Sequence, residues 1–229
     1  NQFTEEYVHY FAKPKAHEGD VYYDFNDLVK AMQVNPTGTF KLGSSMNASN
    51  VQPAGKSYVT NAFKGTLEST EGNKFAIHNI TRPLFGNIEG GTVKNLLLEN
   101  VNIDMPGFDR VAPIANVIKN NATVENVKVT GNVIGGNDVA GIINKIDGSG
   151  KVSNVAFIGK IHAAGNKGWY LAGVLGENWK GIVEKAYVDA EITGNKAKAA
   201  GLVYSSQNGG DNNTLGREGV LRNSVAKGS

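Results

Sequence analysis

Val124-Glu125-Asn126-Val127-Lys128-Val129 is the stretch of sequence that decides the fold. Apolar and polar residues alternate in it, the alternation breaks once between Asn126 and Val127, and it then resumes. Alternation with a period of two is typical of a β-strand, and one break indicates a bend that keeps the apolar side chains on one side. The pattern recurs three more times, in Val93-Lys94-Asn95-Leu96-Leu97-Leu98, Val152-Ser153-Asn154-Val155-Ala156-Phe157 and Val183-Glu184-Lys185-Ala186-Tyr187-Val188.

A second mark precedes each of these stretches. Its copies begin at residues 82, 112, 140, 172 and 200, so they lie 30, 28, 32 and 28 residues apart. They read Arg82-Pro83-Leu84-Phe85, Ala112-Pro113-Ile114-Ala115, Ala140-Gly141-Ile142-Ile143, Ala172-Gly173-Val174-Leu175 and Ala200-Gly201-Leu202-Val203. No helical pattern separates the strands, which argues against βαβ folds and leucine-rich horseshoes. We therefore predict an all-β protein, a right-handed parallel β-helix whose coils span residues 39–229.

The residue at the bend has a structural role in this prediction. Asn95, Asn126 and Asn154 would lie directly above one another, and their amides would form a ladder of hydrogen bonds. Lys185 interrupts the ladder, so we expect a local change in that turn. The next corner carries mostly small residues, which suit a tight turn. They are Asn100, Gly131, Gly159 and Ala190.

Residues 1–38 are predicted to cap the open end of the coils with one short helix, because an uncovered coil end exposes unpaired strands. Apolar residues recur there at helical spacing after Asp24, the expected N-cap, and Asn35-Pro36 would end the helix. They are Phe25, Leu28, Val29 and Met32. Thr39-Phe40-Lys41-Leu42 is expected to be the first strand.

The last coil contains a polar, glycine-rich insertion at residues 205–219. Insertions in solenoids often lie on a binding face, so Asn208, Asp211 and Arg217 are candidate partner-binding residues. A tolerated surface loop without function is the open alternative. The chain begins at Asn1 and ends within the repeated pattern, so we expect further sequence beyond both ends.

Composition excludes several classes of function. The net charge is +2 and no basic block stands out, so we expect no nucleic-acid partner and no membrane-surface partner. There are no cysteines, which excludes disulfides, cysteine-based zinc sites and a thiol nucleophile. No apolar run approaches the roughly 18 residues that span a bilayer.

No catalytic or metal-binding constellation is found, so we expect neither a catalytic residue nor a cofactor in this stretch of chain. The histidines are scattered, and His17-Glu18 starts like H-E-x-x-H but is followed by Val21 at the position of the second His. Glycosidases and lyases of this fold need at least two carboxylates on one face. The acidic residues considered are spread over the coils: Glu99, Asp104, Asp109, Glu125, Asp189 and Glu191.

Trp169, Tyr170 and Trp179 are the concentrated aromatic residues of the later coils and flank an Ala-Gly mark. Exposed aromatic side chains can anchor a partner, so these three are candidate binding residues. Packing beneath loops is the alternative reading.

The chain resembles the N-terminal domain of bacterial immunoglobulin-A1-protease-type zinc metallopeptidases over residues 20–229. The resemblance rests on Phe63-Lys64-Gly65-Thr66-Leu67, Pro83-Leu84-Phe85-Gly86 and Gly173-Val174-Leu175-Gly176, the last being similar to the GLUG repeat. It implies a secreted or cell-wall-attached bacterial virulence protein. Its zinc would bind an H-E-x-x-H and a distal Glu in a C-terminal catalytic domain, and no position here matches those residues.

Three functions follow. The first is a non-catalytic module of a surface zinc metalloendopeptidase, with a host glycoprotein such as immunoglobulin A1, and other domains of the same protein, as partners. The second is an adhesin-like binding module without a protease. The third, which the scattered carboxylates disfavour, is a carbohydrate-active enzyme.

Overall fold

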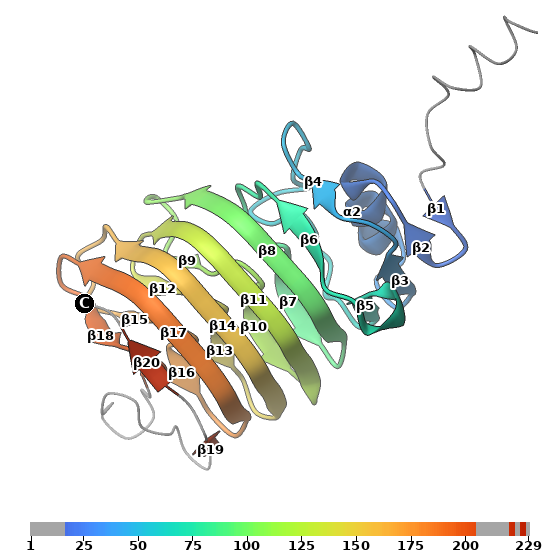
Figure 1. The fold of residues 1–229 in the computed structure, drawn as a ribbon. Coiled ribbons are helices and arrows are strands. Elements are labelled where there is room, and N and C mark those ends of the chain that lie inside the picture. Colours follow the sequence, from blue (N-terminus) through green and yellow to red (C-terminus); the bar gives the residue numbers. More distant parts are fainter. Residues whose placement is uncertain (1–16, 205–219, 223–224, 228–229) are drawn as a thin grey trace, which may run out of the picture.

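The computed structural model describes residues 17–204, 220–222 and 225–227. They form a stack of parallel coils, a β-solenoid, in which each coil lies beside the previous one (Figure 1). The all-β, parallel part of the sequence prediction is thereby confirmed. Among the strands of the described residues, all pairs are parallel except that of β1 (His17–Glu18) with β2 (Val21–Tyr22), which is antiparallel.

The largest sheet runs the length of the stack. Its remaining strands are β3 (Thr39–Leu42), β4 (Met46–Asn47), β5 (Thr66–Ser69), β6 (Phe75–His78), β8 (Thr92–Asp104), β11 (Ala122–Gly135), β14 (Gly150–Ala163), β17 (Ile182–Gly194), β19 (Val220–Arg222) and β20 (Val225–Lys227). A 3₁₀ helix, η1 (Thr70–Gly72), separates β5 from β6. The bent strands β8, β11, β14 and β17 carry the repeated V-x-N-V-x-V pattern.

Two smaller sheets, of four strands each, close the coils from β7 (Phe85–Glu89) onward. One contains β7, β10 (Ala115–Lys119), β13 (Ile143–Ile146) and β16 (Glu177–Asn178). The other contains β9 (Arg110–Val111), β12 (Asp138–Ala140), β15 (Tyr170–Ala172) and β18 (Lys198–Ala200). β9 is an edge strand, because its sheet ends there on the N-terminal side.

The register places the repeated residues above one another, as the sequence marks predict. Val124 pairs with Val93 on one side and with Val152 on the other, and Val152 pairs with Val183. All four are fully buried. The inward column of each strand is therefore an unbroken apolar stack, which is the main stabilising contact of a solenoid.

The asparagines of the first bend form a hydrogen-bonded ladder. Asn126 Nδ2 donates to Asn95 Oδ1 at 2.7 Å, and Asn154 Nδ2 donates to Asn126 Oδ1 at 3.0 Å. All three have φ near +50°, a left-handed conformation that Asn adopts more readily than most residues. The change expected at Lys185 is absent, because Lys185 keeps the same turn with φ +52° and the register continues through it.

We expect Asn126→Ala to lower the free energy of unfolding by about 2 kcal/mol, because it loses two side-chain hydrogen bonds and strains a left-handed residue. Asn126→Gly keeps the turn and loses only the bonds, so it should cost about 1 kcal/mol. Urea unfolding measures both. Asn132→Ala, at an exposed position of the same strand, is the control. Equal costs for Ala and Gly would show that the backbone conformation at Asn126 is unstrained.

A second amide ladder, which sequence analysis missed, lies at the other bend of the early coils. Asn79 Nδ2 donates to Asn47 Oδ1 at 3.0 Å, and Asn100 Nδ2 donates to Asn79 Oδ1 at 2.6 Å. The later coils have Gly131 and Gly159 at this corner, both with positive φ. The ladder is therefore confined to the N-terminal part of the stack.

The predicted helix is present as α2 (Phe25–Val34), at the N-terminal end of the stack (Figure 1). Asp24 caps it by accepting a hydrogen bond from Asp27 N at 3.0 Å. Its four predicted core residues, Phe25, Leu28, Val29 and Met32, are all buried. β3 (Thr39–Leu42) lies where the first strand was expected, but it is not the first, because β1 and β2 precede it in the same sheet.

The residues of the Ala-Gly mark stack in a column, along which the backbones of neighbouring coils approach closely. A Cβ at Gly141 would collide with the carbonyl oxygen of Gly173 and lie 2.6 Å from the Phe157 ring. Only glycine leaves room for the neighbouring coil at this position. The mark in the sequence therefore reports contact between coils.

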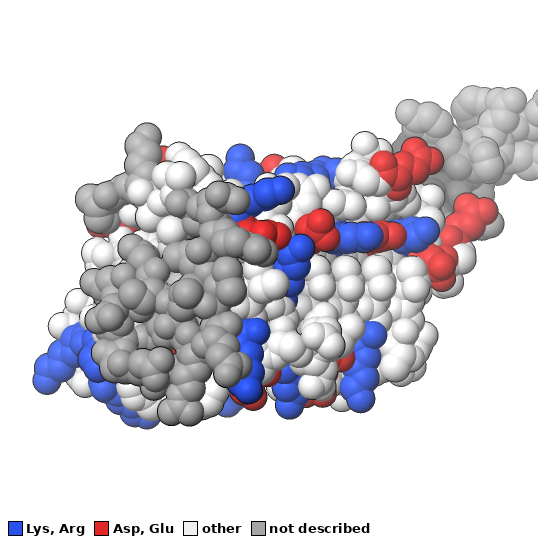
Figure 2. Space-filling model, turned by 90° about the horizontal axis from the view of Figure 1, so that it is seen from below, with Lys and Arg blue, Asp and Glu red and all other residues white. Residues whose placement is uncertain are grey.

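Charged side chains on the outer face lie in rows that run across the coils, with uncharged residues between them (Figure 2). In one row Lys41, Glu68, Lys94 and Glu125 are neighbours in register on successive strands. The ion pair between Lys94 and Glu68 has a separation of 3.2 Å. Alternating signs place unlike charges side by side, which favours this register.

Candidate functional site

A small pocket lies where the two smaller sheets meet in the later coils. It has a volume of about 250 Å³ and is lined by Arg110, Asp138, Trp169, Tyr170 and Glu177. Arg110 pairs in register with Asp138, and the residues that follow Asp138 and Tyr170 pair with each other. Three successive coils thus supply one wall, and Glu177 of β16 supplies another.

The aromatic ring of Trp169 is held by two cations. The Arg110 Cζ atom lies 4.6 Å and the Lys167 Nζ atom 4.8 Å from its ring centroid, and such contacts contribute about 0.5–1 kcal/mol each at exposed sites. The neighbouring Tyr170 ring stacks on Tyr204 at 5.0 Å. Both rings are half-buried and fixed by these contacts.

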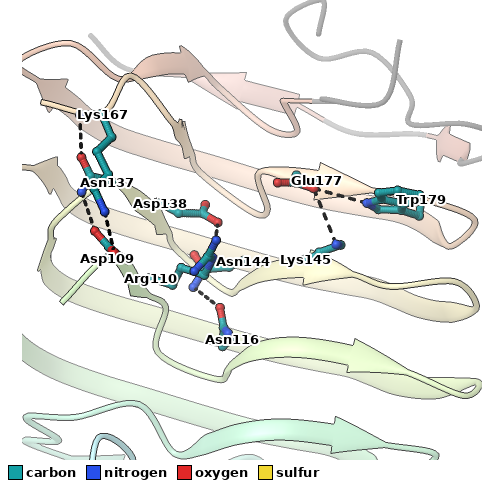
Figure 3. Close-up of polar contacts among 10 residues, drawn as sticks. All are labelled: Asp109, Arg110, Asn116, Asn137, Asp138, Asn144, Lys145, Lys167, Glu177 and Trp179. Atoms are coloured by element: carbon teal, nitrogen blue, oxygen red, sulfur yellow. Dashed lines mark hydrogen bonds and ion pairs between the residues drawn. The ribbon is translucent and has the colours of Figure 1, made fainter. Parts of the chain in front are cut away.

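The loop before Trp169 is tied to the coil beneath it. Lys167 Nζ donates to Asp109 Oδ2 at 2.9 Å, and Asn137 Nδ2 donates to Asp109 Oδ1 at 2.7 Å (Figure 3). The Lys167 amide also donates to Asn137 Oδ1 at 2.9 Å. The hydrogen bond from Lys167, and then that from Asn137, holds the pKa of Asp109 below its usual value. This network positions Trp169 over the pocket.

Glu177 connects the pocket with Trp179. Trp179 Nε1 donates to Glu177 Oε2 at 3.2 Å, and Lys145 Nζ lies 3.9 Å from the same carboxylate oxygen (Figure 3). Lys145 Nζ also lies 4.7 Å from the Trp179 ring centroid. Trp179 therefore stands beside the pocket and fixes one of its carboxylates.

Asp138 is the unusual member of the site. Its side chain is 6% exposed, and its nearest cation, Arg110 Nε, lies 3.8 Å from Oδ2, which is long for an ion pair. Oδ1 has no hydrogen-bond partner among the residues that the structure describes. Burial raises the pKa of Asp138 to about 8, and Glu177 adds to the rise, while Arg110 and Lys145 oppose it. The carboxyl group is consequently mostly protonated at neutral pH.

A larger cleft adjoins the pocket and shares Arg110 with it. It has a volume of about 480 Å³ and lies between residues 56–60 and 105–112. Phe108 lines it, with Lys56 Nζ and Arg82 Cζ each 5.6 Å from the ring centroid. The cleft and the pocket therefore meet at Arg110 of β9.

Three comparisons identify relatives of the chain. The model of the M26 IgA1-specific metallo-endopeptidase N-terminal region matches residues 1–131. The chain belongs to this family. It is 46% identical over its whole length to the zinc metalloprotease ZmpB of Streptococcus pneumoniae TIGR4, and 32% identical to an immunoglobulin A1 protease of Streptococcus sanguinis. It spans about 12% of the length of each of these curated relatives.

A solved structure of an IgA1 protease has the same fold. The similarity has a TM-score of 0.67 at 22% sequence identity, and it covers 95% of this chain and 20% of that one. The family resemblance stated from sequence is thus confirmed. One of these relatives is named as a zinc metalloprotease. In the described part of this chain, no three His, Asp or Glu residues lie close enough together to hold a metal ion.

The structure places the predicted aromatic residues as follows. Trp169 and Tyr170 line one pocket, and Trp179 reaches it through Glu177. Asn208, Asp211 and Arg217 lie outside the described residues. Among the residues that the model describes, no helix is long and apolar enough to cross a membrane.

Sequence analysis missed Arg110, Asp138 and Glu177. A signal for the first two exists, since Asp138 follows Arg110 by 28 residues (138 − 110 = 28), a spacing that the repeat itself shows. A carboxylate two residues before a buried Ala-Gly mark is also unusual, because apolar residues follow it directly. Glu177 carries no such signal, because only the fold brings it to the pocket.

Proposed function

We propose that the chain is a non-catalytic recognition module of a secreted or cell-wall-attached bacterial zinc metalloprotease. The observation that carries the proposal is the aromatic-walled pocket and the adjoining cleft, which share Arg110 in a chain of the M26 family. A site with fixed aromatic rings and convergent polar groups is typical of recognition. The zinc ion and its ligands would lie in another domain of the protein.

The arrangement of the carboxyl groups supports binding rather than catalysis. Asp138 and Glu177 line one pocket, which resembles the two-carboxylate requirement of glycosidases. Glu177 is engaged by Trp179 and Lys145, however, and the Asp138 side chain is almost closed off from solvent. Neither group is therefore a free, solvated carboxylate of the kind that attacks a substrate or activates water, although both can still form hydrogen bonds.

We propose a host glycoprotein such as immunoglobulin A1 as the partner, together with other domains of the same protein. Support comes from the relatives that are named immunoglobulin A1 proteases, of which the chain matches one segment. An adhesin-like module without a protease is the second candidate. The two differ in the parent sequence, because only the first requires an H-E-x-x-H motif downstream.

The purified chain is expected to bind human immunoglobulin A1 in calorimetry. A variant with Trp169→Ala, Tyr170→Ala and Trp179→Ala should bind at least tenfold more weakly, because aromatic anchors dominate such interfaces. Tyr187→Ala, at an exposed position of β17 on the large sheet, is the control and should bind normally. Unchanged affinity of the triple variant would remove this face from recognition, and no binding by the folded chain would leave a scaffold role.

We also propose a right-handed winding and a capping role for α2. The first agrees with the usual hand of parallel strand connections. Support for the second comes from the Phe25 ring, which meets Tyr58 edge-on at 5.0 Å, and from Gln33, whose side chain accepts from Thr60 N at 2.8 Å. α2 would thereby cover the end of the stack and prevent strand addition there.

A further inference from the structure

Asp138 is a buried polar group whose hydrogen-bonding capacity is only partly used. Its Oδ1 atom has no partner in the described part of the chain, although buried polar atoms almost always have one. Leaving such a group unpaired costs about 1–3 kcal/mol. Native proteins keep such a group where it serves a ligand or an ordered water. The pocket that Asp138 lines is the place where that partner would sit.

The charges on the residues that line the pocket cancel. Arg110 contributes one positive charge and Glu177 one negative charge, while Asp138 is mostly uncharged at neutral pH because its pKa is about 8. A cationic ligand would meet Arg110, and an anionic ligand would meet Glu177. Each would be desolvated against a like charge, which is unfavourable. The balance favours a ligand without net charge.

The hydrogen-bonding groups suit hydroxyls. Protonated Asp138 offers both a donor and an acceptor, Arg110 offers donors, and Glu177 offers acceptors. Hydroxyl groups both donate and accept, so neighbouring hydroxyls on one ring can satisfy all three side chains. Trp169 and Tyr170 provide apolar walls that are already fixed by their own contacts, which lowers the entropy lost on binding.

We propose that this pocket binds a neutral, hydroxyl-rich ring, namely one pyranose unit of a glycan. The proposal rests on the proposed function, which is recognition of a glycoprotein, because it identifies the carbohydrate of that glycoprotein as the part that is bound. The volume of about 250 Å³ restricts the occupant to about one ring, and the adjoining cleft leaves space for the chain that carries it.

The test uses the two tryptophans of the chain as reporters. Two indole N–H signals are expected in a nitrogen–proton correlation spectrum, and Trp169→Phe and Trp179→Phe assign them. Glucose, galactose, mannose, N-acetylglucosamine and N-acetylgalactosamine are titrated at pH 7. At least one should shift the Trp169 signal with a Kd on the order of 1 mM. For that ring, the amino-sugar or uronic-acid analogue should bind at least threefold more weakly.

Two variants locate the site. Asp138→Ala should weaken binding of the sugar at least tenfold, and Arg110→Ala, at a position exposed enough to leave folding intact, severalfold. Glu125→Ala, at an exposed position on the large sheet, is the matched control. A Trp169 signal that no neutral sugar moves, or affinity that survives both variants, would overturn the proposal and leave an ordered water as the partner of Asp138.

The proposal and the proposed function can fail separately. Immunoglobulin A1 stripped of its glycans by glycosidases should bind the chain at least tenfold more weakly than the intact protein. Equal binding of both forms would overturn the sugar site and keep glycoprotein recognition. Binding of free sugar without binding of immunoglobulin A1 would keep the sugar site and reject that partner.

Discussion

Asp138→Asn is expected to make the stability of the protein less sensitive to pH between pH 5 and 8. The pKa of Asp138 rises from 3.8 in an unfolded chain to about 8 in the fold, so the folded state binds the extra proton in this range. The free energy of unfolding must therefore fall as pH rises toward 8, by up to about 1.4 kcal/mol per pH unit. Below pH 4 the contribution is fully present.

The Asn variant has no such proton to lose. The free energy of unfolding of the variant minus that of the unmodified chain should therefore increase by on the order of 3 kcal/mol between pH 5 and pH 8. Urea unfolding at several pH values gives this difference, in which other titrating groups largely cancel. Asp104→Asn, at an exposed position of the large sheet, is the control for the exchange of a carboxyl group for an amide. A flat difference for Asp138→Asn would mean that Arg110 keeps the carboxyl ionised.

The sequence contained most of the information about the repeated coils. The spacing of Asn126 and Asn154 predicted neighbouring positions, and their side chains are hydrogen-bonded in the structure. Such a prediction is possible because each coil contacts the next at the same residues, so a constraint on packing appears as a period. The period did not predict the amide ladder of the early coils, because the spacings between Asn47, Asn79 and Asn100 are unequal, at 32 and 21 residues.

The pocket was harder to predict because it depends on contacts across the period. Trp169 was noticed for its residue type, but its contact with Arg110 joins two residues in different coils. Glu177 reaches the pocket from the neighbouring sheet, and nothing in its local sequence shows on which side it lies. At Lys185 the sequence predicted a change of the turn that the structure does not have. The neighbouring coils hold the left-handed conformation there, although a lysine by itself disfavours it.

Gly159→Ala is expected to be among the most damaging single changes in the described coils. Gly159 has φ +148°, and an added Cβ would meet the carbonyl oxygen of Gly131 and lie 2.9 Å from its carbonyl carbon. The contact is between backbones of adjacent coils, so no side chain can move aside. We expect a loss of about 3 kcal/mol, from backbone strain and from overpacking, and a melting temperature lower by about 6–12 °C.

Gly148→Ala is the matched control for this change. Gly148 also has a positive φ, +86°, but nothing lies within 4 Å of an added Cβ, so only the strain of about 1 kcal/mol should appear. The difference between the two variants isolates the contact between coils. Ala190 makes the comparison decisive, because it pairs with Gly159 in register and is accommodated without a positive φ. If Gly159→Ala cost no more than Gly148→Ala, the corner of β14 would be able to adopt the backbone conformation of the β17 corner at Ala190. Glycine would then be favoured by the turn but not required by the contact between coils.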